Sequence, residues 1–565
     1  MNMYLCHISL IKRLKSSNSL KESLMHNLIQ KLLSHSIEER NKKVLFFYKN
    51  YKLVSSLSIN EMMEKACQIA SKIIENDIKD ENIILSFENE ENFVTYFFGI
   101  ILSGNTPVPM ASNALMLKKD FEELLFQFAS SAKTKYIAAK KTPAGYTNIL
   151  KLDEAKKLAS SFANPTLEDT CFIQYSSGST SAPKGVVIRH KNLLANNEQI
   201  NIGIKLTDKD SICTWLPLHH DMGLIGSLMT ALLSNLECHI VRTQDYVIAP
   251  HKWLHLVSET KCSALCIPNS AYYVCATKIP ESKLEGLDLS HIRFAQCGAE
   301  PIKANVLDAF SKRFKKYGFN SKAIMPVYGL AEATLAVTFH EVGTQYKKQS
   351  RDNEEYISCG KVLSPTELEI RNSENGIGEI YIKGPSISDH YYGRATHLED
   401  GWLNTGDLGF LDEDKNLYIT GRSKDLIICN GVNIYANDIE FEAAKVPQVK
   451  LGRIVAFSVP GLDGELAKIV IETNEKSLEG RNKIKEQVIE ILRSKITLTL
   501  DSIIIVPELT LKKTTSGKVK RQDARQRFLK GELNKVEKRF GLNLLASKWI
   551  KNKFKFNFLL REKIG

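Results

Sequence analysis

The sequence predicts an α/β protein with a large N-terminal domain of α/β layers, which contains a β-rich subdomain, and a small α/β C-terminal domain. The chain has 565 residues, too many for a single hydrophobic core, so two to four domains are expected. Apolar strand patterns alternate with helical patterns up to about residue 330, which is typical of a largely parallel sheet. Hydrophobic residues make up 43% of the chain and charged residues 25%, the balance of a globular protein in water.

The first elements follow from local patterns. Leu20, Leu24, Leu28 and Leu32 recur at helical spacing, so an amphipathic helix is expected from Ser19 to about Leu33. The next expected elements are a hairpin of strands 44–48 and 52–54, a capping box over 58–61 that introduces a helix over 62–75, a strand over 82–87 and a helix over 93–102.

The chain changes character after about residue 355. Short strands at 367–370, 378–382 and 416–419, separated by glycine, asparagine and aspartate turns, predict a β-rich subdomain over about 356–420. Strands at 454–459 and 467–472 and a helix at 483–494 predict a second α/β unit. The expected organisation is an N-terminal domain (1–422), a junction (423–424), a C-terminal domain (425–530) and a basic extension (531–565).

The net charge of +12 is concentrated at the C-terminal end. Residues 511–565 contain 17 Lys and Arg against 4 Asp and Glu, a net charge of +13, so residues 1–510 sum to about −1. A nearly neutral body argues against nucleic-acid binding, and the basic end favours an acidic partner. Aromatic residues stand among the last lysines, so this end could instead touch an anionic membrane surface or be a solvated tail.

Cysteine use and the absence of targeting patterns predict a cytoplasmic protein. Eleven cysteines are scattered without a Cys-x-x-Cys pair, which fits a reducing compartment rather than a disulfide framework or a zinc site. The longest mostly apolar run, 93–102, is too short to span a bilayer. Residues 1–14 place basic residues after apolar ones, the reverse of a signal peptide.

Residues 175–185 read Tyr-Ser-Ser-Gly-Ser-Thr-Ser-Ala-Pro-Lys-Gly and follow an apolar run, 171–175, that predicts a strand. The backbone N–H groups, hydroxyls and lysine of such a loop are the groups that hold a polyphosphate. The spacing of a Walker A loop is absent, and a Ser-rich surface linker is the alternative. The candidate phosphate ligands are Ser176, Ser177, Gly178, Ser179, Thr180 and Lys184.

Six further motifs follow this loop. They are Trp-Leu-Pro-Leu-His-His-Asp-Met-Gly-Leu (215–224), Gly-Ala-Glu-Pro (298–301), Tyr-Gly-Leu-Ala-Glu (328–332), Trp-Leu-Asn-Thr-Gly-Asp (402–407), Gly-Arg-Ser-Lys-Asp (421–425) and Thr-Thr-Ser-Gly-Lys (514–518). Their order and spacing resemble the adenylate-forming superfamily of acyl-CoA synthetases, adenylation domains and fatty acyl-AMP ligases over roughly residues 20–530. The first three motifs, each with its following residues, most resemble those of a fatty acyl-AMP ligase.

The resemblance implies two half-reactions with ATP and Mg²⁺. A fatty acid carboxylate attacks the α-phosphate of ATP to give acyl-adenylate and pyrophosphate, and a thiol then takes the acyl group and releases AMP. Lys518 would bridge the carboxylate and the α-phosphate, because a fixed cation offsets the repulsion between two anions. Glu332 would hold Mg²⁺, which prefers hard oxygen ligands. A solvated lysine and a glutamate at a helix N-terminus are the alternatives.

The same resemblance implies a nucleotide site. Tyr328 would pack on adenine, Asp407 would accept both ribose hydroxyls, and Arg422 would contact the ribose or a phosphate. The alternatives are a core aromatic residue, a β-turn residue and a solvated charge, respectively. The other residues assigned to ATP and AMP binding are Gly298, Ala299, Glu300 and Gly329.

His220 matches the histidine that lines the carboxylate end of the acyl site in the superfamily. It has an adjacent histidine, His219, but no further ligand pattern, which makes a metal role a poor fit. A packed histidine after a strand is the alternative. The candidates for the acyl tunnel are Met222, Ile225 and Tyr272, and each of them could equally be a core residue.

Lys424 matches the hinge of the superfamily, which implies that the C-terminal domain is mobile and rotates between the half-reactions. An exposed lysine in a linker is the alternative. Two residues depart from the superfamily pattern: Ser181 replaces a usual glycine, which stiffens the loop, and His219 replaces a usual tyrosine. Fatty acyl-AMP ligases usually carry an insert where this chain has the short polar segment 339–356, whose length is that of CoA ligases.

Three functions are therefore weighed. In the first, the acyl group passes to the phosphopantetheine thiol of an acyl carrier protein, whose usual acidity suits the basic C-terminal end. The second function is that of a long-chain acyl-CoA synthetase, in which CoA accepts the acyl group. The short segment 339–356 favours this function. The third is a non-catalytic acyl- or nucleotide-binding protein, against which Lys518, Glu332 and Asp407 argue.

Overall fold

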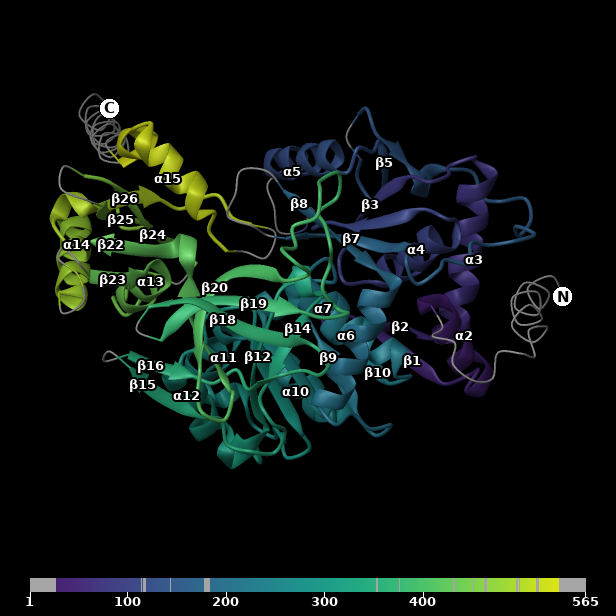
Figure 1. Cartoon of the computed structure of the whole chain (residues 1–565), viewed down its shortest axis with the longest axis horizontal. Coiled ribbons are helices and arrows are strands. Elements are labelled where there is room, and N and C mark those ends of the chain that lie inside the picture. The colour runs from purple at the N-terminus through teal and green to yellow at the C-terminus, as the bar shows by residue number, and fades with distance from the viewer. Residues whose placement is uncertain are drawn as a thin grey trace, which may run out of the picture. The chain divides into compact units, whose positions relative to one another are not determined.

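The computed structural model describes residues 27–537, apart from 113, 115–117, 143, 177–182, 352–353, 375, 430–431, 451, 462–464, 494–495, 497 and 515–517. The described residues form two compact units, one of residues 27–176 and 183–420 and the other of residues 421–537. Figure 1 shows the helices and strands of both units and labels many of them. No helix in the described part of the chain is long and apolar enough to span a bilayer.

The first unit is built around a nine-stranded sheet. Its strand order is β17-β14-β13-β12-β11-β9-β10-β1-β2. The six strands from β13 to β1 in that order are parallel, and antiparallel strands stand at both edges. The strands are β1 (Lys43–Lys49), β2 (Lys52–Ser58), β9 (Ser211–Thr214), β10 (Glu237–Val241), β11 (Ala264–Pro268), β12 (Phe294–Gly298), β13 (Ile324–Gly329), β14 (Ala336–Phe339) and β17 (Lys361–Val362). Every residue of β12 is buried, as expected of a parallel strand covered on both faces.

Helices connect the strands of this sheet. The parallel strand pairs confirm the expected largely parallel sheet. Parallel strands require crossover connections such as these helices. Figure 1 labels α6, α10, α11 and α12 beside the sheet. These connections are α6 (His190–Gly203), α7 (Asp221–Gly223), α8 (Thr230–Leu233), α9 (Thr243–Ile248), α10 (Pro250–Thr260), α11 (Asn269–Thr277) and α12 (Ala304–Phe314), and the π-helix η3 (Leu224–Met229) precedes α8.

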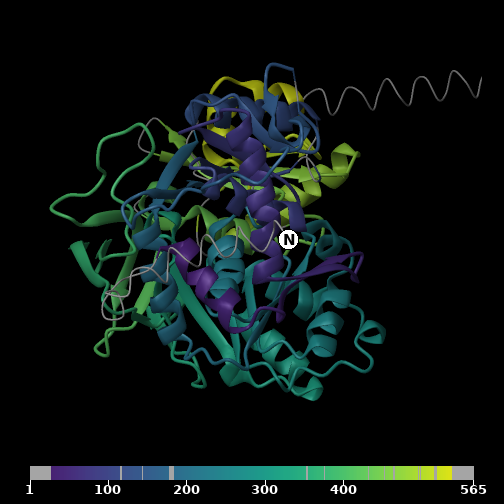
Figure 2. The same cartoon turned by 90° about the vertical axis from the view of Figure 1, so that its right-hand side faces the viewer.

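A second, four-stranded parallel sheet has the order β4-β3-β5-β6. Its elements, with the helices that accompany them, are α2 (Leu28–Glu38), α3 (Ile59–Glu75), β3 (Asn82–Ser86), α4 (Glu91–Leu102), β4 (Thr106–Pro109), α5 (Lys118–Ser131), β5 (Tyr136–Ala139) and β6 (Thr147–Asn148). The predicted capping box is confirmed: Ser58 Oγ accepts from the backbone N–H of Glu61, and the Glu61 carboxylate accepts from the N–H of Ser58. Helices α3 and α4 pack against each other, on the side of the first unit that faces the viewer in Figure 2.

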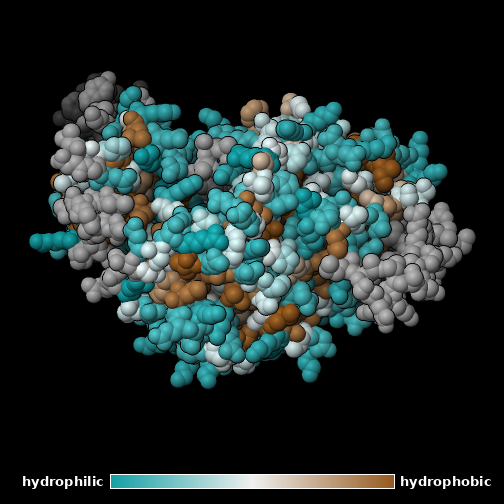
Figure 3. Space-filling view, in the orientation of Figure 1, coloured by the Kyte–Doolittle hydropathy of each residue, from teal (hydrophilic) through white to brown (hydrophobic). Residues whose placement is uncertain are grey.

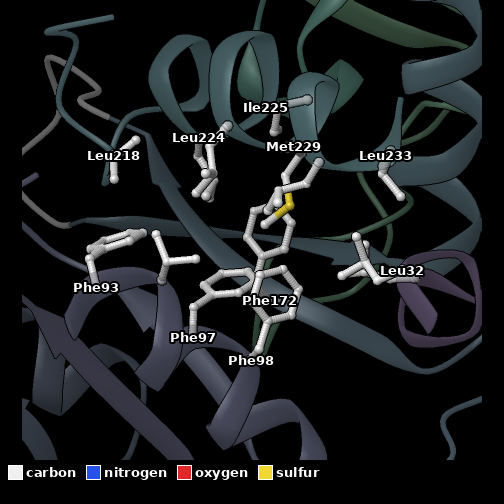
Figure 4. Packing of buried hydrophobic residues seen from close by; sticks show 14 of the residues in the cluster. Leu32, Phe93, Phe97, Phe98, Phe172, Leu218, Leu224, Ile225, Met229 and Leu233 are labelled. Carbon is white, nitrogen blue, oxygen red and sulfur yellow. The ribbon is translucent and has the colours of Figure 1, made fainter. Parts of the chain in front are cut away.

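The main core lies between α4, β7 (Thr170–Ser176) and η3. Phe93, Phe97 and Phe98 of α4 pack with Phe172 of β7 and with Ile225 of η3 (Figure 4). All five side chains are buried, which explains why the apolar run over 93–102 is a core helix. Most of the residues seen in Figure 3 are by contrast hydrophilic, with hydrophobic residues in several groups between them.

The remaining strands of the first unit form hairpins and a small sheet. The elements are the antiparallel pair β7 (Thr170–Ser176) and β8 (Lys184–Arg189), the antiparallel pair β15 (Lys348–Arg351) and β16 (Glu354–Ile357), and a sheet of β18 (Glu367–Glu374), β19 (Ile377–Lys383), β20 (Leu403–Leu411) and β21 (Leu417–Arg422). The β-rich character expected for 356–420 is therefore confirmed. Strand β20 was not predicted, because Asn404, Thr405, Gly406 and Asp407 carry turn-forming residue types.

The second unit has a three-stranded sheet with helices on both faces. Its elements are the hairpin β22 (Leu426–Cys429) and β23 (Val432–Tyr435), α13 (Ala436–Ala443), β24 (Ile454–Pro460), β25 (Glu465–Thr473), α14 (Leu478–Leu492), β26 (Ile503–Pro507) and α15 (Arg521–Leu529). Side chains of β24 alternate between the two faces: Ile454 packs with α13 and α14, and Val455 and Phe457 pack with Phe528 of α15. The unit thus has its own core.

The expected local elements agree with the structure within a few residues. The hairpin extends to Ser58, the helix predicted over 62–75 begins at Ile59, and the helix predicted over 483–494 begins at Leu478. The helix predicted over 19–33 lies partly outside the described residues, and in the described part α2 begins at Leu28 after a capping box at Asn27.

Candidate active site

Three of the sequence motifs meet at one edge of the nine-stranded sheet. Strands β9, β11, β12 and β13 are parallel, with Pro268 opposite Gly298 and Cys297 opposite Pro326. Their carboxyl ends therefore share an edge, where ligands of α/β proteins usually bind. Segment 215–224 follows β9, segment 298–301 begins at the end of β12, and segment 328–332 begins in β13.

The glycines of two motifs allow a close approach of backbones. A Cβ atom on Gly298 would lie 2.8 Å from Val327 Cγ2, and one on Gly329 would lie 1.9 Å from the carbonyl oxygen of Leu335. Ala299, next to Gly298, has a φ of +62°, which a residue with a side chain adopts at a cost. A larger residue at Gly329 would force the backbone at Leu335 to move, and one at Gly298 would press against the side chain of Val327.

Glu300 binds the start of a helix. Its two carboxylate oxygens accept from the backbone N–H of Ser270, at 2.8 Å, and from Ser270 Oγ, at 3.1 Å. Ser270 lies in the first turn of α11, so the carboxylate satisfies N–H groups that the helix leaves open. Its assigned proximity to a nucleotide base stays a prediction.

Tyr328 and Asp407, both assigned to the nucleotide, are in direct contact. Tyr328 Oη donates to Asp407 Oδ2 at 2.7 Å, and both side chains are buried. Asp407 lies within β20 rather than in a turn. Gly406 has a φ of +72°, and Thr405 Oγ1 accepts from the N–H of Asp407 at 3.1 Å, so the strand is bent at this point.

Glu332 is held by a tyrosine that the sequence did not indicate. Tyr391 Oη donates to Glu332 Oε1 at 2.8 Å, and the carbonyl of Glu332 accepts from the N–H of Ser388 at 2.8 Å. Lys184 Nζ lies 5.1 Å from the centre of the Tyr391 ring, within range of a cation–π interaction. The structure therefore brings the predicted phosphate ligand Lys184 and the predicted metal ligand Glu332 to one tyrosine.

Backbone pairing explains how Tyr391 reaches this position. The N–H of Tyr392 donates to the carbonyl of Gly185 at 2.7 Å, and the N–H of Val187 donates to the carbonyl of His390 at 3.3 Å. The segment thus forms an antiparallel β-bridge with β8, in which Tyr391 is opposite Val186. No local pattern marks such a pairing, because its two sides lie about two hundred residues apart in the sequence.

His397 packs against the same tyrosine. The centres of the His397 and Tyr391 rings are 4.6 Å apart. Burial lowers the pKa of His397, and the negative charge of Glu332 opposes that shift. A neutral imidazole therefore stands beside Tyr391 and Glu332.

The predicted phosphate loop closes between the two strands of a hairpin. Ser176, at the end of β7, is opposite Lys184, at the start of β8. The candidates Ser177, Gly178, Ser179 and Thr180 lie outside the described residues. Gln174, two residues before Ser176, donates from Nε2 to the carbonyl of His219 at 2.9 Å and so joins this hairpin to the His219–His220 turn.

The turn that contains His220 is fixed by buried polar contacts. Asn89 donates to the carbonyl of Leu216 at 2.8 Å and accepts from the N–H of Leu218 at 3.0 Å. His220 precedes α7, and its Nδ1 lies 2.6 Å from Asp221 Oδ1. No group of three or more potential metal-ligating His, Cys, Asp or Glu side chains occurs among the described residues.

The three candidates for the acyl tunnel are buried. Met222 lies in α7, two residues after His220, and Ile225 lies in the π-helix η3, a helix type that often occurs at functional sites. Tyr272 packs edge-on against Phe310, and its hydroxyl donates to the carbonyl of Gln296 at 3.2 Å. These positions agree with the core alternative, and the acyl role stays a prediction.

The remaining candidates belong to the second unit. The backbone N–H of Lys518 donates to Thr514 Oγ1 at 3.1 Å, and its carbonyl accepts from the N–H of Thr514 at 2.7 Å. Arg422 is the last residue of β21, a strand that begins in the first unit and whose residues 421–422 belong to the second. Lys424 lies in the short 3₁₀ helix η8 (Ser423–Asp425), and both side chains are exposed. Their roles at a nucleotide and at a hinge stay predictions.

Residues 33–392 match the family model of the AMP-binding enzymes, a stretch that contains the phosphate-loop hairpin and the edge of the nine-stranded sheet. The chain belongs to the AMP-binding enzyme family. The resemblance to adenylate-forming enzymes is thereby confirmed, and with it the expectation that the chain is an enzyme.

Relatives of this AMP-binding enzyme match most of its length. A protein of Caulobacter vibrioides provisionally named acyl-CoA synthetase is 31% identical over 85% of this chain and 91% of its own. The medium-chain-fatty-acid–[acyl-carrier-protein] ligase JamA of Moorena producens is 30% identical over 89% of this chain and 95% of its own. A solved structure from a study of fatty acyl-adenylate ligases of E. coli and L. pneumophila has a TM-score of 0.81 at 29% identity, over 90% of this chain and 98% of its own. The predicted fold class is therefore confirmed.

Proposed function

We propose that this enzyme uses ATP to convert a fatty acid to acyl-adenylate, with release of pyrophosphate, and then transfers the acyl group to the phosphopantetheine thiol of an acyl carrier protein. The observation that carries the proposal is the pair of contacts at the end of β13, where Tyr328 meets Asp407 and Glu332 meets Tyr391. Ligases named for fatty acids and solved fatty acyl-adenylate ligases support it.

The nucleotide end of the site suits ribose and phosphate. A carboxylate offers about four acceptor positions, so Asp407 can accept ribose hydroxyls in addition to Tyr328 Oη. Lys184, at the end of the phosphate loop, supplies a cation for the β- and γ-phosphates that leave as pyrophosphate. Tyr391 keeps this lysine and the carboxylate of Glu332 close together.

The residues around Glu332 fit a magnesium ion that is held largely by the nucleotide. Mg²⁺ in such sites uses one or two carboxylates together with substrate phosphates and water, and Glu332 is a single carboxylate whose orientation Tyr391 fixes. When bound, the ion would supply positive charge to the phosphate oxygens. The role of Glu332 would be to hold one carboxylate oxygen in a fixed position as a ligand for this ion.

The chemical step joins two anions. An oxygen of the fatty acid carboxylate forms a bond to the α-phosphorus, the bond from this phosphorus to the bridging oxygen of pyrophosphate breaks, and pyrophosphate leaves with its electron pair. Lys518 is assigned to this step as the cation between the carboxylate and the α-phosphate, which lowers the repulsion during approach. In the second half-reaction the thiol loses its proton and its sulfur bonds to the acyl carbon, the bond from this carbon to the phosphate oxygen breaks, and AMP leaves with the electron pair.

The choice of acyl carrier protein rests on charge. The net charge of +13 over residues 511–565 would attract an acidic carrier, and one relative is named for such an acceptor. The second candidate function is that of a long-chain acyl-CoA synthetase. The short segment 339–356 favours it, since only eight residues separate β14 from the hairpin of β15 and β16.

One experiment tests both half-reactions. The enzyme is incubated with ATP, Mg²⁺ and fatty acids of varied length, and pyrophosphate release is measured before CoA or holo-carrier protein is added in parallel. Pyrophosphate release followed by transfer to the carrier supports the proposal. Efficient acyl-CoA formation would replace it with the second function, and no pyrophosphate with any acid would refute both.

A lysine substitution tests the assigned chemistry. Lys518→Ala should lose adenylate formation and keep nucleotide binding, because the lysine acts on the reacting groups. Lys530→Ala, an exposed lysine that follows α15, is the matched control and should keep full activity. Unchanged activity of Lys518→Ala would refute the role.

A further inference from the structure

Arg521 forms a buried ionic network in the second unit. It is the first residue of α15, three residues after Lys518, and only 11% of its side chain is exposed. Its guanidinium contacts three elements. The partners are Asp425 Oδ1 at 3.2 Å from Nε, Asn437 Oδ1 at 2.8 Å from Nη2, and Glu440 Oε1 and the carbonyl of Ala456, both of which accept from Nη1.

These contacts balance the cost of burial. A charged group is stable inside a protein only when it is paired and its hydrogen-bonding groups are used, and the planar fork of arginine can serve several acceptors at once. Burial works against the charge of Arg521, but Glu440 and Asp425 outweigh it, so the pKa of Arg521 is raised. Glu440 also accepts from the N–H of Ala456 at 2.8 Å, which ties α13 to β24.

Asp425 links this network to the predicted hinge. It is the last residue of η8 and directly follows Lys424. The ion pair with Arg521 therefore connects the first residues of the second unit to the start of α15.

The residues around Lys518 are paired with each other immediately before Arg521. Besides the two hydrogen bonds between Thr514 and Lys518, Lys513 and Val519 form a β-bridge, and the N–H of Lys520 donates to the carbonyl of Lys512 at 2.8 Å. These contacts join residues 512–514 to residues 518–520. Arg521 directly follows Lys520, so its contacts with Asp425 and Glu440 hold the end of this loop against the rest of the unit.

We propose that Arg521 is a positioning residue that fixes the Lys518 loop to the segment after the hinge, so that Lys518 and η8 move as one rigid body. The proposal rests on the function assigned above to Lys518. A cation that neutralises charge between two reacting groups must be held within a fraction of an ångström, and a displacement of about 1 Å can reduce a rate about a hundredfold. The transfer half-reaction does not use Lys518 and should depend less on Arg521.

The test compares the half-reactions in an Arg521→Lys variant. Lysine keeps the charge but cannot serve three elements at once. We expect the rate constant of adenylate formation to fall about 10–100-fold, with the KM for ATP and the rate of transfer from preformed acyl-adenylate within about twofold of the unmodified enzyme. Asp425→Asn should give the same pattern more weakly, and the double variant should be less than additive, because both changes break one contact.

Arg525→Lys is the matched control. Arg525 lies on the same helix, and its Nε donates to the carbonyl of Ser458 in β24, without a contact to η8. We expect this variant to keep both half-reactions. Equal slowing of both half-reactions in Arg521→Lys, together with a lower unfolding temperature, would show a merely structural role and overturn the proposal, as would unchanged adenylation.

Amide hydrogen exchange separates this inference from the proposed function. In Arg521→Lys and in Asp425→Asn, the amides of Thr514, Lys518 and Lys520 should exchange faster, whatever the enzyme's substrate is, because the base of the loop is loosened. Unchanged exchange in both variants would overturn the rigid link. Absence of pyrophosphate release from the unmodified enzyme would instead refute the proposed function.

Discussion

Tyr391 Oη donates a hydrogen bond of 2.8 Å to Glu332 Oε1. The contact joins a residue that follows β13 to one that forms a β-bridge with β8, and the same tyrosine ring lies 5.1 Å from Lys184 Nζ. The predicted ligands of the metal and of the phosphates therefore share one support. Any change in this tyrosine should act on both.

Tyr391→Phe tests the hydroxyl alone. The phenyl ring keeps the contact with Lys184, while the hydrogen bond to the charged Glu332, worth about 1.5 kcal/mol, is lost. We expect the catalytic efficiency of adenylation with Mg²⁺ and ATP to fall roughly tenfold, since each 1.4 kcal/mol is a factor of about ten. Initial rates of pyrophosphate release over a range of Mg²⁺ concentrations measure the effect.

The neighbouring Tyr392→Phe is the control for that change. Tyr392 contributes its backbone N–H to the bond with Gly185, which a phenylalanine retains, so this variant should keep its activity within about twofold. Equal efficiencies of Tyr391→Phe and the unmodified enzyme would show that Glu332 needs no support from the hydroxyl.

Sequence patterns predicted the parts of the fold that depend on neighbours in the chain. The Ser58 capping box and the core helix over 93–102 follow from spacing within a few residues, and the structure confirms both. The residues that support the site could not be found in that way. Tyr391, Gln174 and Arg521 act through contacts with segments far along the chain, and nothing in their local sequence marks those contacts.

The strand that contains Asp407 shows a second limit of prediction from local sequence patterns. Residue types that favour turns occupy positions 404–407, yet the segment is part of β20 because pairing with β19 outweighs local preference. Gly406, with its positive φ, bends the strand there. The resemblance, by contrast, was sufficient to assign Asp407 and Tyr328 to one predicted nucleotide site, and the structure shows that the two side chains are in contact.

Asp407→Asn should weaken nucleotide binding. Asparagine keeps the shape and can still accept from Tyr328, but the negative charge that favours two ribose O–H donors is gone. We expect the KM for ATP to rise about tenfold or more. Tyr328→Phe should raise it less, because it removes one donor to Asp407, and the double variant should be less than additive. Steady-state kinetics with ATP varied measures all three, and a thermal scan checks the fold.

The reverse order of effects would contradict this assignment. If Tyr328→Phe raised the KM for ATP more than Asp407→Asn did, the buried pair would serve mainly to hold β20 against β13. A ribose role for Asp407 would then lose its support.

The pH dependence of stability should reflect His190. This residue, at the start of α6, is fully buried, and neither ring nitrogen has a hydrogen-bond partner among the described residues. Burial lowers the pKa of His190 to about 4, and the charge of Asp169 offsets this only in part. Between about pH 4 and its ordinary pKa near 6.5, the unfolded chain binds more protons at this position than the folded chain does.

The free energy of unfolding should therefore rise with pH through that window and level off above it. The contribution of His190 is fully present above about pH 6.5 and is lost as the pH falls towards 4, with a magnitude of about 3 kcal/mol at most. Denaturant unfolding of the whole enzyme at several pH values, followed by tryptophan fluorescence, measures it. Trp215, Trp253 and Trp402 all lie in the first unit, as does His190.

His190→Phe should flatten this dependence without removing it. Burial also lowers the pKa values of His239, His291, His340 and His397, and these residues remain in the variant. An unaltered slope in His190→Phe would mean that His190 does not titrate on unfolding in this range.

Removal of the basic end tests the choice of acceptor. Residues 541–565 contain six Lys and Arg and one Glu, so their deletion removes a net charge of +5. Attraction between this charge and an acidic carrier is screened within about 10 Å at 0.1 M salt. We expect the deletion to slow transfer to the carrier several-fold at low ionic strength and much less at high ionic strength, with adenylate formation unchanged.

A same-length variant with Gln at 548, 551, 553 and 555 should slow transfer in the same salt-dependent way, because charge rather than chain length is the cause. Equal loss at all salt concentrations would assign the effect to a contact other than charge, and slowed adenylation would place the basic end at the first half-reaction.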